Sequence, residues 1–217
     1  MVKIRQVLLT ALCLLPLTTQ AVRIEPASGG HWSQASQKGE NRVLTRQVPG
    51  TAVKEVKLEA VINAPIEQVW TTISTVDRYP DFMPYVDAIE ITAQESSERA
   101  YVYHKVDPPL VSQRDYTLLI VNEFDEQTGE YYRYWTQMNQ FGPEPKRGVV
   151  RLEICDGSWA LSPREDGRTD VVYWVYTDPG GSIPAWLANK ANTIGLYDIL
   201  KAVEKRAQDL SWQDKTE

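Results

Sequence analysis

The stretch Asp178-Pro179-Gly180-Gly181-Ser182-Ile183-Pro184 decides the fold of this chain. Its first proline lacks an amide donor and its glycines favour a turn, so a strand ends here, whereas Pro184 suits the first turn of a helix. Beyond it, apolar residues recur at helical spacing to about residue 208. They are Leu187, Ala191, Ile194, Leu196, Leu200, Val203, Ala207 and Leu210. One long C-terminal helix is therefore predicted, with one face against a sheet.

The region before this stretch is dominated by strand patterns. Apolar and polar residues alternate, and turn residues interrupt them, as expected for consecutive antiparallel strands. The expected strands are residues 41–48, 53–62, 87–93, 100–106, 115–124, 131–138, 148–154, 158–162 and 169–177. Pro49-Gly50 and Asp156-Gly157 are read as hairpin turns. A short helix is expected after Pro65. The fold class is α+β, with about nine antiparallel strands and a long C-terminal helix.

The first 21 residues have the features of an export signal. Lys3 and Arg5 precede an apolar run from residue 7 to 17, and small residues end at Ala21, where cleavage is expected. The run is too short to span a membrane. The predicted organisation is a signal peptide (1–21), a short linker (22–30), one domain (31–210) and a tail (211–217). The mature protein is expected to be periplasmic or extracellular.

Charge and reactive residues exclude several function classes. The formal net charge of the whole chain is −6, and the predicted signal carries only basic charges, so the acidic balance argues against nucleic-acid binding. After cleavage Cys155 is the one remaining cysteine, so no internal disulfide can form. His31 and His104 are too few and too separated for a histidine-based metal site. No catalytic constellation is recognised, and neither a metal nor a cofactor is expected.

Five strings of the chain resemble the steroidogenic acute regulatory protein-related lipid-transfer (START) family. They are Thr45-Arg46-Gln47-Val48-Pro49-Gly50, Ala64-Pro65-Ile66-Glu67-Gln68-Val69-Trp70, Ser112-Gln113-Arg114-Asp115-Tyr116, Lys146-Arg147-Gly148-Val149-Val150-Arg151, and the stretch from Thr177 to Pro184. The resemblance spans about residues 30 to 210. It implies a helix-grip fold, in which a curved antiparallel sheet grips the long helix around an internal hydrophobic cavity that holds one lipid.

The resemblance also suggests which residues bind the ligand. In sterol-binding animal members a carboxylate pairs with the arginine that Arg114 matches, but the aligned strand here has Tyr103-His104-Lys105, which argues against a sterol. Arg114 and Asp115 must point to opposite faces of a strand, and Arg114 is expected in the cavity. Its partner would be Glu153 or a lipid phosphate, and a surface salt bridge is the alternative.

The remaining candidates line the cavity or its entrance. Aromatic and apolar side chains of the strands and helix are expected to contact the ligand, and a loop beside the long helix is expected to act with it as a gate. The ligand-binding candidates are Arg114, Tyr103, Tyr134, Glu153, Tyr173, Trp186 and Ile194, and the gate candidates are Phe141, Pro143 and Gly195. Ordinary core packing accounts for the same aromatic pattern, and close packing accounts for Gly195.

The sequence thus predicts a monomeric, non-catalytic lipid carrier that makes transient contact with membranes. The wider superfamily of this fold includes cyclases, so an enzyme acting on a hydrophobic substrate is the alternative. In that case His104 and Arg114 would be the acid-base residues.

Overall fold

The computed structural model describes residues 30–109 and 111–209. The predicted signal peptide and nearly all of the predicted linker and tail lie outside these residues. The elements, in chain order, are β1 (Ser33–Lys38), β2 (Asn41–Gln47), β3 (Lys54–Ile62), α1 (Ile66–Ser74), η1 (Val76–Arg78), α2 (Tyr79–Phe82), β4 (Val86–Gln94), β5 (Arg99–Val106), β6 (Arg114–Asp125), β7 (Glu130–Gln137), η2 (Asn139–Phe141), β8 (Val150–Arg151), β9 (Ile154–Pro163), β10 (Thr169–Asp178) and α3 (Ala185–Gln208).

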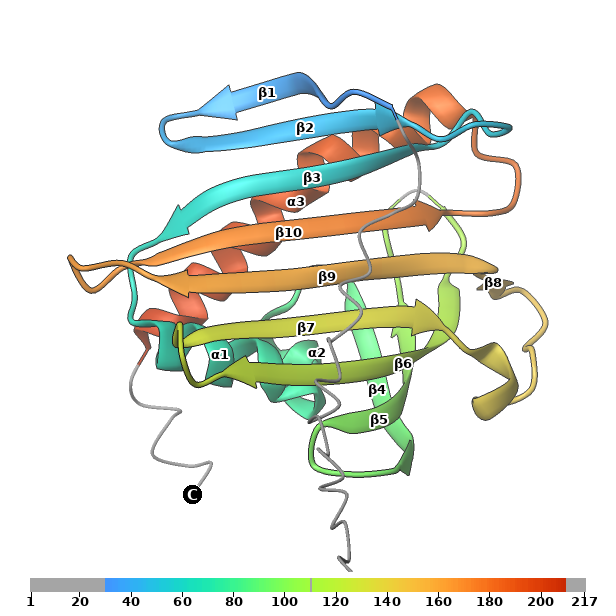
Figure 1. The fold of residues 1–217 in the computed structure, drawn as a ribbon. Helices are drawn as coiled ribbons and strands as arrows, with labels where there is room; N and C mark the ends of the chain where they lie inside the picture. The colour runs from blue at the N-terminus through green and yellow to red at the C-terminus, as the bar shows by residue number, and fades with distance from the viewer. Residues whose placement is uncertain (1–29, 110, 210–217) are drawn as a thin grey trace, which may run out of the picture.

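The strands form one curved sheet that α3 crosses on one side (Figure 1). The strand order is β1-β2-β3-β10-β9-β7-β6-β5-β4, and the short β8 pairs with β6 in parallel. All other pairs are antiparallel. We call the side that faces α3 the inner face and the opposite side the outer face. This arrangement confirms the predicted α+β fold of a sheet around a long C-terminal helix.

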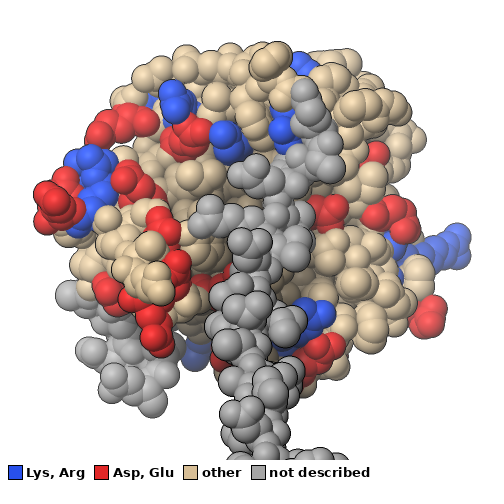
Figure 2. Space-filling view, viewed as in Figure 1, with Lys and Arg blue, Asp and Glu red and all other residues tan. Residues whose placement is uncertain are grey.

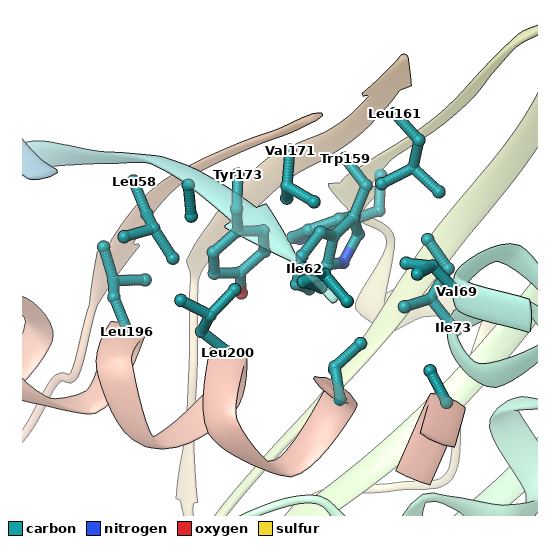
Figure 3. Close-up of a cluster of buried hydrophobic side chains, with 14 of the residues drawn as sticks. Leu58, Ile62, Val69, Ile73, Trp159, Leu161, Val171, Tyr173, Leu196 and Leu200 are labelled. Carbon is teal, nitrogen blue, oxygen red and sulfur yellow. The ribbon is translucent and has the colours of Figure 1, made fainter. Parts of the chain in front are cut away.

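The core lies between the inner face and the C-terminal half of α3. Strand β3 shows why: Val56, Leu58 and Ile62 alternate with charged residues, so the apolar side chains share the inner face. Figure 3 shows Leu196 and Leu200 of α3 pointing toward this layer. Each fully buried aliphatic side chain contributes about 1.5–3 kcal/mol.

Three features of the sheet differ from the sequence prediction. The strand expected at residues 148–154 is reduced to the two residues of β8. A further strand, β1, pairs with β2 at the edge, where no strand was expected. Residues 154–163 form one continuous strand, so Asp156-Gly157 is not a hairpin turn. Gly157 lies where the Trp135 ring from β7 crosses β9, and any Cβ there would overlap that ring. The glycine therefore makes room for a neighbouring side chain rather than for a turn.

Candidate functional site

The inner face of the sheet carries a wall of aromatic side chains below α3. Trp159 of β9 stacks on Tyr173 of β10 with ring centroids 4.2 Å apart, and Trp135 of β7 lies 5.8 Å from the same tyrosine. Tyr116 of β6 stacks on His104 of β5 at 5.1 Å. Strand alternation directs these rings to the same face of the sheet. The strand register then places Tyr173 opposite Trp159, and His104 opposite Tyr116.

Arg114 lies at the start of β6, on the inner face beside β8. Its side chain is only 5% exposed, and burial lowers the pKa of its guanidinium. One hydrogen bond is described for it, donated to the carbonyl of Ser112. No carboxylate of the described residues lies within ion-pair distance, so a buried cation with several donors has little to bind inside the protein.

A second buried arginine, Arg133 of β7, shows the contrast. Its guanidinium donates to Asn122 Oδ1 at 2.8 Å, to the Ser74 carbonyl at 3.3 Å, to Tyr79 Oη at 3.4 Å and to the Ile73 carbonyl. These carbonyls belong to the C-terminal end of α1, where the helix dipole favours a cation. Arg133 thus has a structural role, whereas Arg114 has donors to spare.

Three more polar groups on this side have no described partner. The hydroxyls of Tyr116 and Tyr173 neither donate a hydrogen bond to any described residue nor accept one from it. Both hydroxyls are buried, and burial raises the pKa of each phenol. The buried Nδ2 of Asn192 in α3 also lacks a partner. Asn192 lies four residues from both Ala188 and Leu196, which are buried, so it faces the sheet. Together with Arg114, these groups offer donors to a ligand rich in oxygen acceptors.

Sequence reasoning missed Asn192 and Arg133. The signal for Asn192 was available, because it is a polar residue within the helical stripe that includes Ala188, Leu196 and Leu200. No local signal distinguishes Arg133, because its acceptors belong to a helix about 60 residues earlier in the chain.

His104 is held as a neutral ring. Burial lowers its pKa to about 4, and Arg133 acts in the same direction. Its Nδ1 lies 3.2 Å from the Val102 carbonyl, and no carboxylate of the described residues contacts the ring. Cys155, nearby on β9, is likewise inert, since burial raises the pKa of its thiol to about 12.

Two hollows stand out among the described residues. The first, of about 680 Å³, lies over the outer face and runs from Trp32 across Trp174 to Glu123. The second, of about 320 Å³, lies between the β1–β2 hairpin and α3, and includes Lys38 and Tyr197. Neither is enclosed between the sheet and the helix. The enclosed cavity therefore stays a prediction.

Comparison with known proteins places the chain in a family. The family model described as polyketide cyclase/dehydrase and lipid transport matches residues 62–204. That range is more than half of the 217-residue chain. The chain belongs to this polyketide cyclase and lipid transport family.

Similar proteins of this family include START lipid-transfer proteins. A STAR-related lipid transfer protein from Xanthomonas axonopodis is 28% identical with a TM-score of 0.73, covering 82% of this chain and 99% of that one. Human phosphatidylcholine transfer protein is 29% identical over 125 residues, 55% of this chain and 58% of that protein. An uncharacterized protein of Pseudomonas aeruginosa is 27% identical over 200 residues, 90% of this chain and 98% of that protein. The predicted START resemblance and helix-grip fold are confirmed.

Several residues that the START resemblance suggested as ligand contacts lie elsewhere. Tyr103 and Tyr134 are on the outer face, because they alternate with inner residues of β5 and β7. Tyr103 donates to Asp115 Oδ2 at 3.1 Å and Tyr134 to Glu123 Oε1 at 2.7 Å. Burial and these carboxylates raise the pKa of each phenol to about 12. Of the predicted tyrosines, Tyr173 alone faces α3.

Glu153 is not the partner of Arg114. Its side chain is exposed, and its nearby cation is Arg151, whose pKa it helps to raise. Arg151 in turn pairs with the buried Asp115 on the outer face, at 2.7 and 3.0 Å. Arg114 and Asp115 thus point to opposite faces, and the ion pair formed there is the outer one.

The loop predicted as a gate also packs on the outer face. Phe141 stacks on Tyr101 with ring centroids 4.0 Å apart, and the Pro143 carbonyl accepts a hydrogen bond from Arg151 at 2.9 Å. These contacts come from β5 and β8 and not from α3. The prediction that Phe141 and Pro143 lie beside the long helix is therefore wrong in its placement.

The N-terminal half of α3 packs less closely than its C-terminal half. Trp186 is 68% exposed and Ile194 53%, so the predicted buried stripe is wrong at Leu187, Ala191 and Ile194, all of which are exposed. Asn189 ties this half to the β2–β3 turn, where it contacts the Lys54 amide and the Ala52 carbonyl. A Cβ on Gly195 would meet nothing within 4 Å, which excludes close packing as its reason.

Residues 30–109 and 111–209 contain no helix long and apolar enough to cross a bilayer. The same residues contain no group of three or more histidine, cysteine or acidic side chains that could hold a metal ion.

Proposed function

We propose that this protein binds one lipid between the inner face of the sheet and the N-terminal half of α3, and carries it between membranes. The lipid would have an acceptor-rich polar group, such as a phosphate, next to Arg114. The observation that carries this proposal is that Arg114 is buried without a carboxylate. Burying an unpaired cation costs several kcal/mol, so a site that keeps one is suited to an anionic group.

The other spare donors of the inner face and α3 fit the same ligand. The Tyr116 and Tyr173 hydroxyls and Asn192 Nδ2 can donate hydrogen bonds, and phosphate and ester oxygens accept them. The aromatic wall of Trp135, Trp159 and Tyr173 offers an apolar surface to acyl chains. The relatives named as lipid transfer proteins support the same class of ligand.

The test is lipid binding by the purified protein and by Arg114→Met, which keeps an unbranched apolar stem and removes the charge and the hydrogen-bond donors. Native mass spectrometry followed by extraction should find one phospholipid per chain. Loss of a charge-assisted hydrogen bond costs about 1.5–3 kcal/mol, so Arg114→Met should bind a phospholipid at least about tenfold more weakly. A diacylglycerol, which lacks the phosphate, should bind both forms alike.

The matched control is Arg42→Met, because Arg42 is a half-exposed arginine of β2 that pairs with Glu59 at the surface. It should bind phospholipid as the unaltered protein does. Equal phospholipid affinity in Arg114→Met would refute the anchoring role. A protein that carries no lipid and takes up none would refute lipid carriage itself.

Carriage is proposed in preference to catalysis. An acid-base role would fall to His104, but its ring is neutral at pH 7, stacked on Tyr116, and without a carboxylate to orient it. Turnover of a hydrophobic substrate that is lost in His104→Phe would favour the cyclase-like alternative instead.

Export is the second part of the proposal. The apolar run from residue 7 to 17 and the small residues ending at Ala21 support cleavage there. N-terminal sequencing of the protein isolated from its own host should begin at Val22, in the periplasmic or extracellular fraction. A chain that begins at Met1 in the cytoplasmic fraction would overturn this part alone.

A further inference from the structure

The hollow on the outer face, on the opposite side from the proposed lipid site, is a groove across the middle of the sheet. Its floor consists of two rows of side chains that the strand register aligns. One row is Lys57, Trp174, Ser158 and Tyr134, and the other is Val172, Ala160 and Tyr132 followed by Glu123. The small residues Ser158 and Ala160 lie between larger side chains, which makes the middle of the floor low.

The groove contains one unsatisfied donor. The side chain of Trp174 is only 6% exposed, and its indole Nε1 has no hydrogen-bond partner among the described residues. Trp174 is on the outer face because it alternates with Tyr173, and it lines the groove. A buried N–H without an acceptor costs about 1–3 kcal/mol. An occupant of this groove should therefore present a carbonyl oxygen above Trp174.

The two ends of the groove differ in charge. At one end Arg46 and Lys57 lie over the Trp32 ring, and both already pair with glutamates of β3. At the other end the groove is lined by Glu123, Asp125 and Glu126. Arg133 of β7 also borders the groove, but its guanidinium points to the inner face, where the carbonyls of α1 accept its hydrogen bonds. Figure 2 views the molecule from this side and shows both signs of charge. The acidic end is thus open to a cation.

The described part of the chain begins at the basic end of this groove. A Cβ on Gly30 would lie 3.3 Å from Cγ of Arg46, so Gly30 itself lies beside Arg46. From β2, which contains Arg46, to β6 the path crosses five strand spacings, about 24 Å. An extended chain covers about 3.3–3.6 Å per residue, so the seven steps from Gly30 back to Arg23 reach about 24 Å. Arg23 can therefore reach the acidic end.

We propose that the outer groove is the docking site for residues 22–29 of this same chain. In this arrangement the segment Val22-Arg23-Ile24-Glu25-Pro26-Ala27-Ser28-Gly29 lies across β10, β9 and β7. A backbone carbonyl accepts the Trp174 indole hydrogen, and Arg23 lies among Glu123, Asp125 and Glu126. Cleavage after Ala21 would add the positive amino group of Val22 at the same acidic end. The segment does not touch the inner face, so its docking is separate from lipid binding.

A disulfide trap tests the position of the segment. The exported chain with Ala27→Cys and Val172→Cys should form an intramolecular disulfide, because Ala27 would lie over β10. The pair Ala27→Cys and Lys146→Cys is the control, since Lys146 is exposed in the loop after η2, away from the groove. Cys155 is buried and stays out of the exchange. Equal cross-linking of both pairs, or a disulfide only between two chains, would overturn the proposal.

A charge-reversal cycle tests the acidic end independently. Arg23→Glu and Glu126→Lys should each lower the melting temperature by about 2–3 °C, as expected for loss of a surface ion pair in a domain of this size. The double variant should recover most of that loss. Lipid content should stay unchanged in all three, which separates this result from a failure of the proposed lipid site. If the loss of melting temperature in the double variant equals the sum of the two single losses, the proposed contact is contradicted.

Discussion

At the scale of single residues, the inner face is distinguished by donors that lack acceptors. Arg133 uses its guanidinium on α1, whereas Arg114, Tyr116, Tyr173 and Asn192 keep donors available below α3. Proteins pair nearly all buried polar groups, so several spare donors on one side of the core indicate a ligand with oxygen acceptors. The same reasoning applied to Trp174 indicates an occupant for the outer groove.

His104 gives a prediction for the pH dependence of stability. Its pKa is about 4 in the folded protein and about 6.5 in an unfolded chain, so the unfolded state binds the proton more readily. The contribution of the neutral His104 ring to the free energy of unfolding is complete above pH 6.5. As the pH falls toward 4, the free energy of unfolding decreases by about 3 kcal/mol in all. Urea unfolding of His104→Phe should show a smaller loss across this window. An unchanged pH profile would contradict a buried neutral ring.

At the scale of elements, the two halves of α3 differ in what holds them. The C-terminal half buries Leu196, Leu200, Val203 and Ala207 against the sheet, while the N-terminal half buries only Ala188. Hydrogen bonds from Asn189 to the β2–β3 turn hold the first half in place of a packed core. The half with fewer buried contacts has the lower cost of opening. We therefore expect lipid to enter below it.

Gly195 lies where the two halves meet. Because its Cβ position is open, Gly195→Ala should stabilise the protein by about 0.5–1 kcal/mol, measured by urea unfolding. If the first half of α3 bends there to admit lipid, the rate of lipid transfer between vesicles should fall. Adding Ala191→Gly at an exposed position of the same half should restore both values. A stabilised protein with an unchanged transfer rate would exclude bending at Gly195.

At the scale of the whole molecule, α3 exposes an apolar surface near the proposed entrance. Trp186, Leu187 and Ile194 share one side of the helix with Lys190. Transfer of one large side chain from water into a bilayer is worth about 1.5–3 kcal/mol. Trp186→Ser should therefore weaken binding to phosphatidylcholine–phosphatidylglycerol vesicles about tenfold in a sedimentation assay. Ile91→Ser, an exposed isoleucine of β4, is the control, and an equal loss in both would argue against docking through α3.

The sequence by itself determined most of the strands, the short helix after Pro65 and the long C-terminal helix, because alternation in strands and helical spacing in helices are local patterns. It did not predict β1 or the continuity of β9, which depend on pairing with neighbouring strands. It also determined that Arg114 and Asp115 point to opposite faces. Which face meets α3 was decided only by the tertiary structure, since pairing across the sheet assigns His104 to the inside and Tyr103 to the outside. The same holds for Gly157, where a ring from β7 and not the local sequence requires glycine. Spare donors such as Asn192 Nδ2 are also a tertiary property, because a partner's absence depends on every residue packed around the group.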